Sequence, residues 1–135
     1  TRFPDRGSVH LQELHPLPGE WRDEALAARF AALRALRAAV TEAIEPLRRD
    51  KTVRSSLEAE VAVPAAQVPQ GFDDVMLAEL FITASVTRHD GETVTAQRTS
   101  EDKCGRCWRL LPDVSEDGAL CGRCESVVGA AEVAA

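Results

Sequence analysis

The spacing of apolar residues between positions 22 and 49 predicts one long helix. Steps of three and four residues separate Leu26, Phe30, Leu33, Leu36, Val40, Ile44 and Leu47. Such steps place the side chains on one face of an α-helix. The residues between them are mostly Ala, Arg and Glu, which favour the helical conformation. We expect Asp23 to cap the N-terminus. Pro46 lacks a backbone N–H, so we expect it to kink the helix, or to begin a new turn, near Glu45.

A single helix cannot bury its own apolar stripe. No second segment of the chain has a helical pattern of comparable strength. We therefore expect the stripe to pack in a helical bundle whose other members precede Thr1 in a longer protein. Residues 1–20 contain three prolines and two glycines, and they predict an irregular lead-in to this helix.

After residue 57 the apolar period changes from about 3.6 to two. Leu57, Ala59, Val61 and Val63 alternate with polar or smaller residues, and Pro64 follows. This alternation predicts a half-buried strand that ends at the proline. Residues 72–77 favour a short helix.

Two further segments predict a β-hairpin. Residues 80–87 are rich in Ile, Thr and Val, which favour strand, and residues 93–98 form a second such segment. The sequence His89-Asp90-Gly91 between them is typical of a turn, in which Gly91 can adopt positive φ. Residues 57–100 are thus expected to form a small α/β unit with a hairpin.

Composition adds limits on the class of protein. Of the 135 residues, 44% are hydrophobic and only 4% are aromatic, so we expect an aliphatic folded core. No apolar run approaches the roughly 20 residues that cross a bilayer, and the chain does not start with a signal peptide. We expect a cytoplasmic protein that does not contact membranes. A formal charge of −6 argues against nucleic-acid binding that depends mainly on phosphate neutralisation.

All four cysteines lie in two tight pairs, which indicate a metal site. Cys104-Gly105-Arg106-Cys107 is separated by thirteen residues from Cys121-Gly122-Arg123-Cys124. Two residues between cysteines let a tight turn aim both sulfurs at one point, and Gly105 and Gly122 permit that turn. Two such turns facing each other supply four thiolates in a tetrahedron, which suits one zinc ion with no open coordination position. The zinc is therefore expected to be structural.

Two other classes of protein use Cys-x-x-Cys pairs. Iron in a rubredoxin-like site takes the same ligands, but that class packs aromatic residues around the metal, and this segment has only Trp108. A dithiol oxidoreductase uses a single Cys-x-x-Cys pair. The nearby apolar residues are too few for an independent core; they are Leu110, Leu111, Val114, Leu120, Val127 and Val128. We expect residues 101–129 to unfold without zinc.

Several motifs together resemble one enzyme family. The segments Lys103-Cys104-Gly105-Arg106-Cys107-Trp108, Asp113-Val114 and Leu120-Cys121-Gly122-Arg123-Cys124 resemble the C-terminal zinc module of bacterial isoleucyl-tRNA synthetases. The stretch from Asp50 to Ala59, Asp-Lys-Thr-Val-Arg-Ser-Ser-Leu-Glu-Ala, is similar to the end of that family's anticodon-binding helical domain. These motifs occur in the family's order over most of the chain.

The resemblance implies an α+β chain with three parts. Residues 1–56 would end a helical anticodon-binding domain, residues 57–100 would form the α/β subdomain, and residues 101–135 would form a four-cysteine zinc-knuckle or ribbon module with a tail. The family is class I and joins isoleucine to its tRNA with ATP. Its nucleotide-binding signatures, of the His-Ile-Gly-His and Lys-Met-Ser-Lys-Ser types, are absent here. ATP and Mg²⁺ would therefore belong to a catalytic domain outside this chain, and no catalytic residue is expected within it.

The implied role is contact with the anticodon stem-loop of the isoleucine tRNA, in cis with the rest of a monomeric synthetase. Trp108 is a candidate for stacking on a base, with packing over the zinc site as the alternative. The candidates for phosphate or base contact are Arg106, Arg109, Arg123, Arg48, Arg49, Lys51 and Arg54, with ordinary solvated charges as the alternative. Two other functions remain open: a protein-docking zinc ribbon, and a structural clamp that holds the C-terminus. The arginine-rich helix before Ser-Ser-Leu-Glu-Ala favours RNA over the isolated ribbon.

Overall fold

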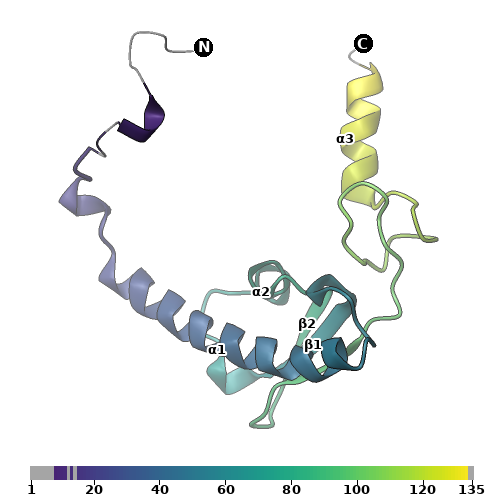
Figure 1. Cartoon of the computed structure of the whole chain (residues 1–135), viewed down its shortest axis with the longest axis horizontal. Helices are drawn as coiled ribbons and strands as arrows, with labels where there is room; N and C mark the ends of the chain where they lie inside the picture. The colour runs from purple at the N-terminus through teal and green to yellow at the C-terminus, as the bar shows by residue number, and fades with distance from the viewer. Residues whose placement is uncertain (1–7, 12, 14, 134–135) are drawn as a thin grey trace.

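The computed structural model describes residues 8–11, 13 and 15–133. A long helix and a small sheet lie together, and a four-cysteine loop with a terminal helix extends from them (Figure 1). The helices and strands are α1 (Glu24–Arg49), β1 (Ala59–Pro64), α2 (Asp74–Phe81), β2 (Ser85–His89), β3 (Thr95–Arg98) and α3 (Gly122–Val133). Short 3₁₀ turns occur at Val9–Leu11, Gly19–Trp21, Ser56–Glu58 and Ala65–Gln67. None of the described helices combines the length and the apolar character needed to cross a membrane.

Helix α1 confirms the predicted amphipathic helix. The Asp23 carboxylate accepts a hydrogen bond from the Leu26 N–H at 2.8 Å, as expected for an N-cap. The helix continues through Pro46 to Arg49 rather than starting anew near Glu45. Pro46 lies in the last turn, where its missing N–H removes only one of the final helical hydrogen bonds.

The apolar stripe of α1 is covered from within the chain, contrary to the expectation that a helical bundle is needed. Leu33, Leu36, Val40 and Ile44 are at most 3% exposed. They share one core with β1, β2 and α2, to which Val63 and Leu77 contribute fully buried side chains. The inner face of a three-stranded sheet with a short helix therefore supplies the apolar partner that the helical pattern required. Only the N-terminal end of the stripe is open, with Leu26 42% exposed.

The sheet has the order β2-β1-β3, so the expected β-hairpin is wrong. Strand β1 pairs with β2 in parallel, across the α2 crossover, and with β3 antiparallel. After β2 the chain crosses the end of β1, a distance of about 10 Å, before β3 begins. The strand with the most buried residues thus lies in the centre, where both of its edges are paired.

Helix α2 is longer than predicted and consumes the start of the expected strand at residues 80–87. It begins after Asp73, whose carboxylate caps the Met76 N–H at 2.8 Å, and it ends at Phe81. The neighbouring Asp74 pairs with Arg88 at 2.5 Å. The part of the expected strand that α2 takes is Leu80 and Phe81, whereas the β-branched residues begin at Ile82, after the helix ends.

Gly91 does not adopt the positive φ expected of it. The Gly91 N–H donates to Nδ1 of His89 at 2.9 Å, and a Cβ at Gly91 would lie 2.8 Å from that nitrogen. A side chain at this position would have to displace the His89 ring, so the glycine leaves room for the imidazole rather than for a left-handed turn.

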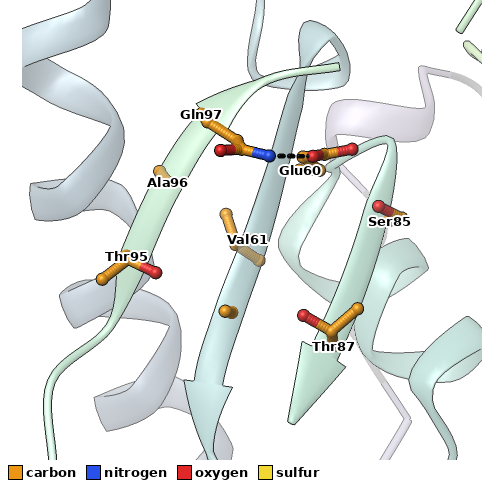
Figure 2. Close-up of a pocket in the computed structure, with 8 residues that line it drawn as sticks. Glu60, Val61, Ser85, Thr87, Thr95, Ala96 and Gln97 are labelled. Atoms are coloured by element: carbon orange, nitrogen blue, oxygen red, sulfur yellow. Dashed lines mark hydrogen bonds between the residues drawn. The ribbon is translucent and has the colours of Figure 1, made fainter. Parts of the chain in front are cut away.

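The sheet face opposite the core is polar. Glu60 and Gln97 are hydrogen-bonded across neighbouring strands, and Ser85, Thr87 and Thr95 lie on the same face (Figure 2). This face forms a shallow hollow of about 250 Å³.

Candidate metal centre

The four cysteine sulfurs converge on one point. All four Sγ atoms lie within 4.8 Å of one another, and those of Cys107 and Cys121 are 3.9 Å apart. A zinc ion with Zn–S distances of roughly 2.3 Å in a tetrahedron requires sulfurs about 3.8 Å apart. Cys104, Cys121 and Cys124 are buried and Cys107 is partly exposed, so the site has the enclosed character of a structural zinc centre. The residues present therefore fit one zinc ion.

The first cysteine pair sits in a short hairpin. Residues Lys103 and Leu110 pair as an antiparallel bridge, and the Cys104 N–H donates to the carbonyl of Arg109 at 2.9 Å. The Trp108 N–H donates to the Cys104 carbonyl at 3.0 Å, and Trp108 has a left-handed φ of 64°. This conformation reverses the chain immediately after the second sulfur.

Gly105 is required because another backbone segment approaches it closely. Its N–H donates to the Ala119 carbonyl at 3.0 Å, and a Cβ at this position would lie 2.4 Å from the carbonyl oxygen of Gly118. The approach brings the loop before Cys121 against the first cysteine pair. The requirement for glycine was predicted, but the reason for it is the meeting of two segments rather than a tight turn alone.

The second cysteine pair is not a copy of the first. Its sequence is identical, but it opens helix α3 at Gly122, and Cys124 lies in the first helical turn. The Gly122 N–H donates to Oδ2 of Asp113 at 2.8 Å, which satisfies an N–H that the helix leaves free. The segment after Cys124 contains Ser126, Val127, Val128 and Gly129, which have low helix propensity, so local propensity alone does not explain this helix. The capping role of Asp113 was not recognised from the sequence because the carboxylate lies nine positions earlier, outside local capping patterns.

Backbone N–H groups stabilise negative charge on one sulfur. Hydrogen bonds from the backbone of Cys107 and then of Cys121 lower the pKa of the Cys104 thiol to about 6. The backbone nitrogen of Cys121 lies 3.4 Å from Sγ of Cys104. Burial raises the pKa of Cys124 to about 11. Because thiolates are the zinc ligands, metal binding is expected to release protons from this cluster.

The apolar cluster around the cysteines is small. Val114 and Leu110 are 6% and 7% exposed, while Leu111 and Leu120 are only partly buried. Val127 was expected in this cluster, but it is 48% exposed on α3. So little buried area leaves the fold of this segment dependent on the sulfur–metal bonds.

The residues predicted to contact RNA are mostly exposed. Trp108 is 67% exposed, so its indole does not form a buried cover over the cysteines. Arg106, Arg123, Arg49, Lys51 and Arg54 are exposed as well. Arg48 pairs with Glu45 at 3.4 Å, and both side chains remain 48% exposed. Arg109 differs, because its side chain is 24% exposed and pairs with Glu79 of α2 at 3.3 Å.

Comparison with known proteins agrees with the metal site. Residues 101–127 match a zinc-finger family described as the zinc finger found in FPG and IleRS. The chain is 50% identical over 131 residues to an isoleucine–tRNA ligase of Zymomonas mobilis, which covers 95% of the chain and 14% of the relative. It is also 40% identical over 142 residues to the ligase of Gluconobacter oxydans, covering 96% of the chain and 15% of that protein.

The chain is similar, over almost its whole length, to the C-terminal region of bacterial isoleucine–tRNA ligases. The resemblance seen in the sequence motifs is thereby confirmed. The chain spans about one seventh of the length of these ligases. The similarity extends well beyond the zinc finger, because it also includes α1 and the sheet.

Proposed function

We propose that this chain is the C-terminal appendage of an isoleucine–tRNA ligase and that it contacts the anticodon stem-loop of the isoleucine tRNA. The parent enzyme would attach isoleucine to that tRNA with ATP and Mg²⁺ bound in its catalytic domain. The observation that carries the proposal is the 50% identity to such a ligase over 95% of the chain. The zinc would hold the RNA-contacting loop in shape and take no part in the chemistry.

The surface chemistry supports RNA contact at two places. Trp108 follows Cys107 directly and is 67% exposed, and Arg106 and Arg123, which lie inside the two cysteine pairs, are exposed as well. The end of α1 presents a second group, formed by Arg48, Arg49, Lys51 and Arg54. Unstacked loop bases bind aromatic side chains, and cations position the sugar–phosphate backbone. Helix α1 would then be the end of the anticodon-binding domain, packed on the α/β subdomain.

A structural clamp is a second candidate, and the Arg109–Glu79 ion pair favours it. This pair connects the zinc module to α2 at 3.3 Å. A partly buried guanidinium that is already paired is a weaker partner for RNA than an exposed one. Arg109 would then orient the zinc module, while its neighbour Trp108 faces outward.

Nuclease footprinting of the isoleucine tRNA on the full-length enzyme separates these functions. Zinc-dependent protection of the anticodon loop is expected if the module contacts RNA. A clamp would instead leave the footprint unchanged in Trp108→Ala and alter it in Glu79→Gln. Absence of protection near the anticodon in the zinc-loaded enzyme would overturn the proposal.

A further inference from the structure

A hollow of about 170 Å³ lies where α1 meets the end of α2. Its wall on α1 contains Arg37 and Arg48, and Ile82 lies on the opposite wall. The remaining lining residues are Thr41, Ile44, Glu45, Ser56 and Phe81. Arg48 pairs there with the one carboxylate, Glu45, at 3.4 Å, so Arg37 supplies the net positive charge of the hollow in an acidic chain. Arg37 has no ion-pair partner in the described part of the chain.

Ile82 has a conformation that its side chain disfavours. It ends α2 with φ 60° and ψ 51°, and its N–H bonds to the carbonyls of Ala78 and Glu79. Glycine is the usual residue at such a helix end, and a β-branched residue is rare there. The side chain is also 47% exposed, so burial does not account for it. The left-handed conformation closes the helix, because it lets the Thr83 N–H donate to the Ala78 carbonyl at 3.0 Å, but the core does not explain an isoleucine at this position.

We propose that this hollow binds the sugar–phosphate backbone of RNA, with Arg37 and Arg48 on phosphates and Ile82 against a ribose. The inference rests on the proposed function and extends the contact surface beyond the end of α1. Arg37 and Arg48 lie eleven residues apart, about 16 Å along the helix, so the surface covers more than one phosphate. Arg49 and Lys51 follow Arg48 in the sequence and are exposed.

Ile82 is tested by two substitutions with a matched control. Ile82→Ala should weaken binding of an isoleucine tRNA transcript to the full-length, zinc-loaded enzyme about three- to tenfold in a filter-binding assay. Val75→Ala is the control, because Val75 is a 64% exposed aliphatic residue on the same helix and does not line the hollow. Ile82→Gly should weaken binding similarly while the Tm of the 135-residue chain stays equal or rises, because glycine adopts the left-handed conformation freely.

The arginines are tested by the salt dependence of binding. Arg37→Gln should lower affinity and reduce the slope of log K against log salt by about 0.7 to 1, since one phosphate contact is lost. Arg34→Gln, on the same helix but outside the hollow, should leave the slope unchanged. Ile82→Ala should lower affinity without changing the slope, because no charge is removed.

The outcomes separate this inference from the proposed function. If none of Arg49→Gln, Lys51→Gln, Arg37→Gln and Ile82→Ala changes the footprint or the tRNA affinity of the full enzyme, both the proposed function and the inference about the hollow are overturned. If Arg49→Gln and Lys51→Gln weaken binding while Arg37→Gln and Ile82→Ala bind as wild type, the proposed function stands and the hollow is not an RNA site. If Ile82→Gly lowers the Tm as much as a core truncation, Ile82 is a packing residue and the inference is overturned.

Discussion

At the residue scale, three side chains occupy backbone positions where glycine is usual. Lys51, Ile82 and Trp108 have φ values of 65°, 60° and 64°, and they are the non-glycine residues with positive φ among the described positions. The left-handed conformation costs roughly 1–2 kcal/mol for a residue with a Cβ. All three side chains are exposed. Local backbone hydrogen bonds accompany each conformation: the N–H groups of Lys51, Ile82 and Trp108 donate to the carbonyls of Arg48, Glu79 and Cys104.

For Trp108, we expect Trp108→Ala to weaken tRNA binding or charging by the full enzyme with zinc content intact. Loss of one stacked base is worth about 1–3 kcal/mol, roughly five- to hundredfold in affinity. Trp21→Ala is the control, since Trp21 is 71% exposed in the lead-in. Filter binding and metal analysis of both variants make the comparison. Unchanged affinity in Trp108→Ala would remove this residue from the RNA surface.

For Gly105, we expect Gly105→Ala to weaken zinc binding about tenfold or more. The new Cβ would lie 2.4 Å from the Gly118 carbonyl oxygen, and relieving such an overlap typically costs 1–3 kcal/mol. Gly129→Ala is the matched control, because a Cβ there meets nothing within 4 Å. Competition with a chromogenic chelator measures both affinities. Equal zinc affinities in the two variants would show that the segments around Gly105 and Gly118 can move apart at little cost in free energy.

At the element scale, the zinc module is held by its metal and the sheet by its core. The cysteine sulfurs themselves make up much of the buried cluster in the module, whereas α1, α2, β1 and β2 bury a continuous aliphatic core. The two parts should therefore respond differently to the loss of metal. Helix α3 depends on the centre as well, because two of the sulfurs, on Cys121 and Cys124, lie at its start.

Chelation of zinc should unfold residues 101–129 and leave α1 and the sheet folded. In amide NMR spectra, the chelator should remove the dispersed signals of residues 101–129 and leave those of α1 and the sheet unchanged. Cys121→Ser should reproduce the chelated spectrum at stoichiometric zinc, and the full enzyme carrying it should lose tRNA charging. Dispersed, unchanged signals from residues 101–129 after metal removal would contradict the prediction.

At the scale of the whole molecule, α1 belongs to the same core as the sheet. Leu33 is fully buried, whereas Leu26, seven residues earlier on the same stripe, is 42% exposed. The chain therefore covers most of the stripe itself, and the beginning of the stripe at Leu26 stays exposed.

We expect Leu33→Ala to lower the free energy of unfolding of the chain by about 2–5 kcal/mol, since it leaves a cavity in this core. Leu26→Ala is the control, and it should have an effect of at most about 1 kcal/mol. Urea denaturation followed by circular dichroism at 222 nm measures both. Similar small effects for the two variants would mean that the stripe is not packed on the sheet.

The sequence alone determined the features that depend on local spacing. The period of the apolar residues predicted α1 and β1, Asp23 was recognisable as a cap, and the two cysteine pairs predicted a four-sulfur site. The helix, the strand and the cap each depend on residues only a few positions apart. The metal site follows from the cysteine spacing, because two Cys-x-x-Cys pairs are typical of a zinc site.

Only the tertiary structure decided how these features meet. It placed β1 between β2 and β3, packed the sheet on α1, and extended α2 to Phe81, inside the segment that was expected to be a strand. It also made the two identical cysteine pairs unlike, and brought Asp113 to Gly122, Gly118 to Gly105 and Glu79 to Arg109. These outcomes depend on which distant surfaces bury each other, and local periodicity carries no information about that choice.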